Sequence, residues 1–260
     1  MTEALLLSTT RVSTFRGRQL LTAATAFFFE RSQRLYAVTS RHVLHDPAAG
    51  HFPDRVEIVL HVDAQNLTRT EVLSVPLYED GQAVWRQGRD SVGEVDVAVI
   101  PIDRTALTDT VVLSAFGPGH LQQSLDEVHV GDQLLVVGFP LGFYDTVHHL
   151  PVVRHAVIAS AFGVRFQGEG YFLTDGRMHR GSSGSPVVMR RDAPGDAMPW
   201  RLLGVHSARM EMGGRDAEND EALGLNCAWY ADILMTLTAE SAAPNPAAMG
   251  PRQGKPLRTS

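Results

Sequence analysis

Short runs of β-branched and aromatic residues, separated by turn residues, recur along most of this 260-residue chain. Enrichment of this kind favours β-strands. A short helical turn is indicated at 40–44, and roughly helical spacing at 229–238. Many short strands with almost no helix predict a sandwich or a barrel, so we expect an all-β fold with one short C-terminal helix. The expected strands lie at 4–29, 35–39, 55–62, 71–78, 95–102, 128–139, 152–161, 171–174, 186–189 and 201–205.

The charge and the cysteine content exclude several classes of protein. The 23 Lys and Arg residues against 29 Asp and Glu residues give a net charge of −6, whereas a nucleic-acid-binding protein needs a basic face. The single cysteine, Cys227, cannot form a disulfide within the chain, which fits a reducing compartment. The leucine run 5–7 is too short for a secretory leader or a membrane span. We expect a cytoplasmic protein without nucleic-acid or membrane partners.

Two glycines bracket a pair of serines at residues 181–184, within the longer stretch 174–188. Glycine lets the backbone turn sharply and direct its N–H groups into a shared concavity. This geometry suits a nucleophilic hydroxyl beside an oxyanion hole. An isolated motif of this kind is more often a surface turn, so the rest of the chain must decide.

A hydroxyl nucleophile needs a base, and the base needs an orienting carboxylate. His42 follows the expected strand 35–39, and Asp96 begins the strand 95–102. Asp96 is favoured because a buried carboxylate before an apolar run needs a partner. Asp90 and Glu94 are its rivals. Ser183 is favoured over Ser182 as the nucleophile by the Gly-x-Ser-Gly spacing.

Three motifs in this order resemble those of chymotrypsin-fold serine peptidases. Residues 37–44 resemble the histidine motif, 96–100 the aspartate strand and 180–186 the serine motif. Bacterial HtrA-type peptidases and glutamyl endopeptidases are the most similar, and the resemblance covers about 20–235. It implies two antiparallel six-stranded β-barrels packed together, with the active site between them. Together with the sequence pattern, it predicts an N-terminal barrel at 1–103 and a C-terminal barrel plus helix at 128–238. Composition predicts a linker at 104–127 and a disordered tail at 239–260, which is rich in Ala and Pro and lacks periodicity.

The resemblance also implies a role for each residue. Ser183 attacks the carbonyl carbon, His42 moves the proton, and Asp96 fixes the imidazole tautomer. The N–H groups of Gly181 and Ser183 form the oxyanion hole. The implied activity is a serine endopeptidase that needs no cofactor and acts on a protein or peptide. Two residues depart from the family pattern: Ser182 stands where Asp or Asn is usual, and Ser185 where Gly is frequent. The shorter side chain at 182 predicts a less rigid oxyanion loop.

A second segment, 203–209, corresponds to the strand that pairs with substrate in this family. The resemblance implies that Ser207, Ala208 and Arg209 bind the peptide backbone. It places His206 in the specificity pocket, where an imidazole N–H can donate to a carboxylate or amide oxygen. It maps Arg177 to the floor of that pocket. Cleavage after Glu, Asp or Gln is one hypothesis. The other is that His206 is a packed strand residue and Arg177 points to solvent.

Other functions remain open at this point. The chain could be an inert peptidase-fold module that binds peptides or proteins, or an enzyme whose 176–182 loop is ordered by an activating partner. His148, His149 and His155 are too loosely spaced for a convincing zinc site. The acidic stretch 211–222 lacks the spacing of an EF-hand, so we expect no metal.

Overall fold

The computed structural model describes residues 2–210 and 224–240. This part of the chain contains mostly strands and three short α-helices, which are α1 (Ala4–Leu7), α2 (Arg41–Leu44) and α3 (Ile233–Leu237). The strands are β1 (Thr9–Arg16), β2 (Gln19–Arg31), β3 (Arg34–Thr39), β4 (Arg55–His61), β5 (Thr70–Pro76), β6 (Tyr78–Glu79), β7 (Gln82–Ala83), β8 (Arg86–Arg89), β9 (Glu94–Ile102), β10 (Gln133–Gly138), β11 (Val152–Ile158), β12 (Tyr171–Asp175), β13 (Pro186–Arg190), β14 (Trp200–Arg209) and β15 (Leu225–Tyr230).

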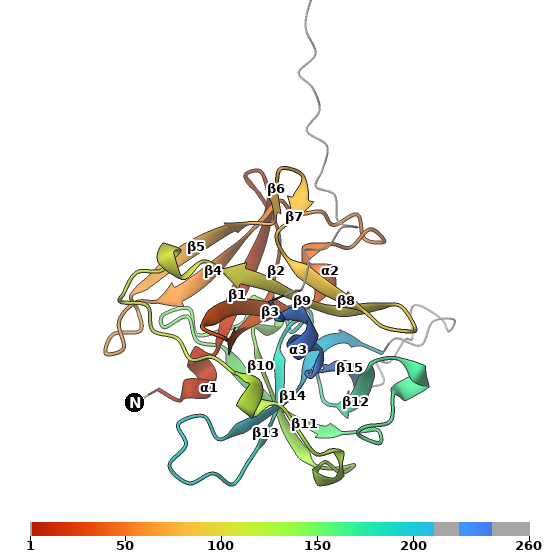
Figure 1. Ribbon diagram of the computed structural model, residues 1–260. Helices are drawn as coiled ribbons and strands as arrows, with labels where there is room; N and C mark the ends of the chain where they lie inside the picture. Colours follow the sequence, from red (N-terminus) through yellow and green to blue (C-terminus); the bar gives the residue numbers. More distant parts are fainter. Residues whose placement is uncertain (1, 211–223, 241–260) are drawn as a thin grey trace, which may run out of the picture.

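The C-terminal half is a closed six-stranded antiparallel barrel, as the resemblance implied. Its strands pair in the order β10-β11-β12-β15-β14-β13, and β13 pairs with β10 to close it. Figure 1 shows this barrel below the N-terminal half. Its interior is filled by alternate apolar side chains of facing strands, including Val136, Phe172 and Leu203.

The N-terminal half differs from the expected six-stranded barrel. Within residues 2–127, all of which the structure describes, seven antiparallel strands form one sheet in the order β5-β4-β1-β2-β3-β9-β8. Strands β5 and β8 are its edges. Residues 77–85 connect these edges through the short β6–β7 hairpin and bury Leu77 and Trp85 in the core. Because β5 and β8 are the two ends of this sheet and do not pair with each other, a second closed barrel is not seen.

Two further expectations need revision or lie beyond the described chain. Residues 4–7 were expected in a strand but form α1, because Ala4 and the three leucines are strong helix formers. The acidic stretch 211–222 and most of the tail 239–260 lie outside the described residues. The division at 103, 127 and 238 stays a prediction.

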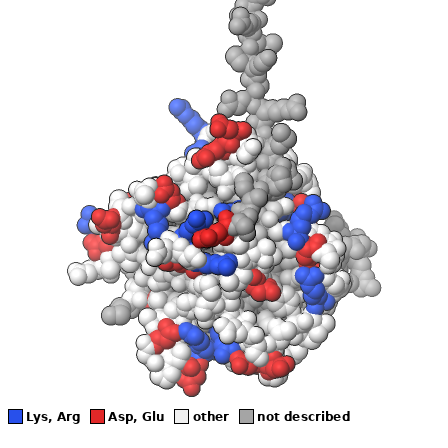
Figure 2. Space-filling view, in the orientation of Figure 1, with Lys and Arg blue, Asp and Glu red and all other residues white. Residues whose placement is uncertain are grey.

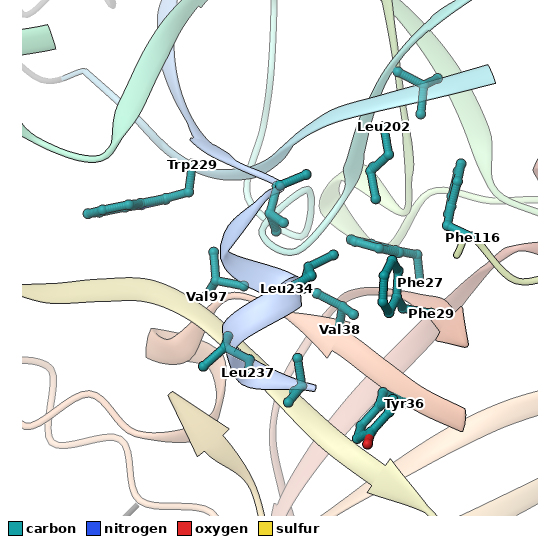
Figure 3. Packing of buried hydrophobic residues seen from close by; sticks show 14 of the residues in the cluster. Phe27, Phe29, Tyr36, Val38, Val97, Phe116, Leu202, Trp229, Leu234 and Leu237 are labelled. Atoms are coloured by element: carbon teal, nitrogen blue, oxygen red, sulfur yellow. The ribbon is translucent and has the colours of Figure 1, made fainter. Parts of the chain in front are cut away.

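A shared apolar core joins the two halves. Phe27, Phe29 and Val38 of the N-terminal sheet pack with Leu202 of the barrel and Leu234 of α3 in one buried cluster. Figure 3 shows α3 beside the strands of the sheet, with its leucines directed into this cluster. Burying each such side chain contributes roughly 1.5–3 kcal/mol. This packing holds the two halves at a fixed distance, which a site between them requires.

Charged side chains are distributed without a dominant sign on the visible face. Figure 2 shows acidic and basic residues interspersed among uncharged ones. No helix among the described residues has the length and hydropathy to cross a bilayer.

Candidate active site

A change from strand to helix brings His42 to the place where the N-terminal sheet meets the C-terminal barrel. The buried strand β3 ends at Thr39, and the single turn of α2 follows it, which turns the His42 side chain toward β9. The His42 backbone N donates to Asp96 Oδ1 at 2.9 Å, and its Nδ1 lies 2.7 Å from Asp96 Oδ2. Because the carboxylate can only accept, Nδ1 carries the proton and Nε2 is free to act as an acceptor when the ring is neutral.

Asp96 is held on β9 by several donors. The Ser207 hydroxyl donates to Oδ2, which also accepts from His42. Arg41 Nε lies 3.9 Å from Oδ1. Burial raises the pKa of Asp96. The hydrogen bonds to the carboxylate and the charge of His42 lower this pKa by a larger amount, so the net pKa is below its ordinary value. The carboxylate is therefore ionised at neutral pH and able to stabilise an imidazolium.

The rival acids have other partners. Asp90 accepts from the backbone N–H groups of Val92 and Gly93 and pairs with Arg165 at 2.8 Å. Glu94 lies on the same strand as Asp96 but pairs with Arg41 at 3.5 Å. The structure brings Asp96, and neither of these two acids, to His42.

Ser183 lies in the loop between β12 and β13. Its Oγ is 3.0 Å from His42 Nε2 and 3.0 Å from the carbonyl oxygen of Ser207, to which it can donate. Gly181 and Gly184 on either side have φ of +89° and +85°, which only glycine adopts at low cost. Ser182 is buried and its N–H donates to His179 O at 3.1 Å. Ser183 is thus the serine within reach of the base.

The same loop presents two backbone N–H groups without an acceptor among the described residues, those of Gly181 and Ser183. The Arg180 carbonyl accepts from Leu141 N at 2.5 Å. Because C=O and N–H point in opposite directions across a trans peptide, the Gly181 N–H is directed away from Leu141. Both N–H groups are thus available as donors, which is one requirement of an oxyanion hole.

His42 is electrostatically prepared to accept a proton. Burial lowers its pKa, but the hydrogen bond and negative charge of Asp96 more than compensate and raise the pKa above the ordinary histidine value. A base with a raised pKa takes a hydroxyl proton more readily.

A cavity of about 330 Å³ opens beside these groups, and its lining comprises His42, His179, Arg180, Ser183, His206, Ser207 and Ala208. His206 is fully buried, and its Nδ1 has no hydrogen-bond partner. Burial, together with the charge of His42, lowers the pKa of His206 to about 4. Its imidazole is therefore neutral at pH 7 and can donate one N–H.

Some of the substrate-binding residues expected from the sequence line this cavity, and others do not. His206, Ser207 and Ala208 line the cavity, but Arg177 is exposed and is not part of its lining. It follows the end of β12, where the next side chain, Met178, turns into the barrel core. The Arg209 backbone pairs with Asn226 in the barrel, and its side chain lies outside the described part of the structure.

Three contributions were missed from the sequence. Ser207 was expected to meet substrate, yet its hydroxyl donates to Asp96. His179 and Arg180 line the cavity, and their place at the start of the serine motif, which begins at Arg180, was the available signal.

Histidines outside this site do not gather around a common point. His148 Nδ1 is 2.7 Å from Asp145 Oδ2 in an exposed turn. Among the described residues, no group of three or more His, Cys, Asp or Glu is placed to hold a metal ion.

A comparison with protein families decides the identity of the fold. The model of the trypsin-like peptidase domain matches residues 24–193, well over half of the chain. The chain belongs to this family. A comparison with curated proteins gives no match. Solved structures similar to this peptidase domain include HtrA-type protease AlgW with a tripeptide (18% identity, TM-score 0.54) and the serine endoprotease from Yersinia pestis (17% identity, TM-score 0.51).

The alignments cover most of this chain but a smaller share of each solved chain. Each alignment covers 89% of this chain but only 58% of AlgW and 61% of the Yersinia pestis enzyme. The chain therefore spans about three fifths of their length. At this level of identity the likeness supports the chymotrypsin-like fold alone.

Proposed function

We propose that this chain is a serine endopeptidase that hydrolyses peptide bonds through an acyl-enzyme. The observation that carries the proposal is the continuous series Asp96–His42–Ser183, with contacts of 2.7 Å and 3.0 Å. A nucleophile within hydrogen-bond reach of a base, which a third group orients, is the arrangement that activates a hydroxyl.

The steps follow from these contacts. Ser183 Oγ attacks the substrate carbonyl carbon as its proton passes to His42 Nε2. The Gly181 and Ser183 N–H groups donate to the resulting oxyanion. His42 then gives the proton to the leaving amine as the C–N bond breaks, which leaves the acyl group on Ser183. Water, deprotonated by His42, releases the acid and regenerates the enzyme. Asp96 stabilises the imidazolium in both halves of the reaction.

Labelling with a fluorophosphonate tests this proposal, because the reagent reacts with activated serine hydroxyls. We expect the purified chain to be labelled at Ser183, as located by mass spectrometry, and the rate to fall at least about 10⁴-fold in Ser183→Ala. Ser182→Ala is the matched control, since it removes a neighbouring hydroxyl and should retain labelling. An unlabelled wild-type chain, or labelling that survives in Ser183→Ala, would contradict the proposal.

The same experiment addresses the alternatives of an inert module and a partner-activated enzyme. The Arg180 carbonyl is already bound by Leu141 N, and the Ser183 hydroxyl already reaches His42. We therefore expect labelling without any added protein. Labelling that requires cell extract would instead favour an activating partner.

We propose further that the enzyme cleaves after Gln, Glu or Asp. The neutral His206 in the cavity can donate an N–H to the oxygen of an amide or a carboxylate. Arg180 lines the same cavity and adds a positive charge for the acidic side chains. Cleavage of a peptide library should show these residues before the cut, and His206→Leu should abolish the preference. A preference for basic or large aromatic residues would refute it.

A further inference from the structure

Thr25 lies on β2 of the N-terminal sheet, yet its side chain binds the serine loop of the barrel. It is fully buried. Its Oγ1 donates to the Gly181 carbonyl at 2.8 Å and accepts from the Phe139 N–H at 3.0 Å. The hydroxyl thus donates one hydrogen bond and accepts another, and both partners lie more than 100 residues away along the chain.

The backbone of Thr25 extends the same connection. Its N–H donates to the Ser183 carbonyl at 3.0 Å. Its carbonyl accepts from Thr39 Oγ1 at 2.8 Å. Thr39 is the last residue of β3, three positions before His42. Thr25 thus connects the end of the strand that leads into the His42 helix with the loop that carries Ser183.

The surrounding glycines show how closely this contact is packed. A Cβ at Gly138 would come within 2.7 Å of Thr25 Oγ1 and would also overlap the Ser185 hydroxyl. A Cβ at Gly184 would overlap the Thr25 carbonyl oxygen. Side chains at either position would displace Thr25 or the loop, so the loop fits against Thr25 in one arrangement.

Gly181 needs such restraint, because glycine rotates more freely than any other residue. The peptide before it is fixed by the bond from Leu141 N to the Arg180 carbonyl. The peptide after it is fixed by the bond from Thr25 Oγ1 to the Gly181 carbonyl. Holding both peptides determines where the Gly181 N–H points.

We propose that Thr25 is a positioning residue that keeps the Gly181 and Ser183 N–H groups directed at the oxyanion. The proposal rests on the proposed peptidase activity. Thr25 acts through the loop and touches no reacting atom. It stabilises the transition state, in which the oxyanion is formed, more than it stabilises bound substrate.

Thr14 provides a matched comparison. It is also a fully buried threonine of the N-terminal sheet, and its hydroxyl also donates to a carbonyl and accepts from an N–H. Both partners belong to Thr22 on the neighbouring strand. Thr14→Val therefore also removes one donated and one accepted hydrogen bond of a buried threonine, without touching the serine loop.

The experiment compares Thr25→Val, Thr25→Ser and Thr14→Val with the wild-type chain. We expect Thr25→Val to lower kcat about 10- to 100-fold, less than the loss of an oxyanion donor itself, with KM within about twofold. The reaction with fluorophosphonate should slow by a similar factor. Thr25→Ser keeps the hydroxyl and should restore kcat to within about threefold. Thr14→Val should keep wild-type kcat even where its melting temperature falls. Equal kcat values for Thr25→Val and Thr14→Val would overturn the proposal.

Hydrogen–deuterium exchange separates this proposal from the proposed activity. We expect faster exchange of the amides in 180–186 in Thr25→Val, with wild-type exchange in Thr25→Ser and Thr14→Val. If the wild-type chain shows no peptidase activity, the proposed function fails, and the exchange measurement still decides whether Thr25 holds the loop. Unchanged exchange would overturn it. If Thr25→Val does not fold, Thr25→Ala removes the same hydroxyl with a smaller side chain.

Discussion

The buried His206 should make the stability of this protein depend on pH. In the unfolded chain its pKa has the ordinary value of 6.5, and in the folded chain it is about 4. Between these values the unfolded chain binds a proton that the folded chain does not. Stability is therefore complete above pH 6.5 and falls as the pH is lowered toward 4.

The size of this effect follows from the two pKa values. Their difference corresponds to about 3 kcal/mol at pH values well below 4. At pH 5, where the unfolded histidine is almost fully protonated and the folded one is mostly neutral, the loss is about 2 kcal/mol. His206 is fully buried, so solvent does not screen this contribution.

Urea unfolding at pH 7.5 and pH 5.0, followed by tryptophan fluorescence, measures this loss of unfolding free energy. The wild-type chain should lose about 2 kcal/mol more than His206→Gln on this change of pH, because glutamine does not titrate. Other titrating groups contribute equally to both proteins. His155→Gln, at an exposed position of β11, is the control for removing an imidazole. Parallel losses in the wild type and in His206→Gln would refute the reasoning.

Two further predictions concern the proposed triad and the serine loop. In the wild-type chain, the rate of fluorophosphonate labelling should rise with pH through the raised pKa of His42. Asp96→Asn removes the charge that raises this pKa, so the midpoint of the pH profile should move to lower pH and the maximal rate should fall about 10⁴-fold. An unchanged midpoint would contradict this. Gly184→Ala places a methyl group against the Thr25 carbonyl and Thr39 Oγ1 at a φ of +85°. It should lower the free energy of unfolding in urea by at least about 2 kcal/mol. A wild-type unfolding midpoint would show that the loop can move aside.

Much of the site could be predicted from the sequence because its residues have local signals. The apolar run before His42, the run after Asp96 and the glycines around Ser183 each indicate an element and a turn. The structure brings these three side chains together. The closed C-terminal barrel was implied by the resemblance to chymotrypsin-fold peptidases, because the strand pattern by itself predicted only a sandwich or a barrel.

The parts that were missed depend on contacts between distant segments. Whether β5 and β8 pair depends on where residues 77–85 pack, and a propensity pattern does not contain that information. Arg177 and Arg180 have similar sequence surroundings, but only Arg180 lines the cavity once Met178 is buried. Thr25 reads as an ordinary strand residue until its partner in the other half is known.

Helix α3 leaves the ribosome after all the described strands, although it covers the N-terminal sheet. Tyr36 donates to the Thr238 carbonyl at 3.4 Å across 202 residues of sequence, and Arg86 donates to the Leu237 carbonyl at 3.2 Å. At about 5–20 residues per second, roughly 8–40 s of synthesis separate the partners of these two hydrogen bonds. A nascent chain that stops before α3 leaves apolar residues of the sheet uncovered, so we expect such chains to be held by chaperones until translation has passed this point.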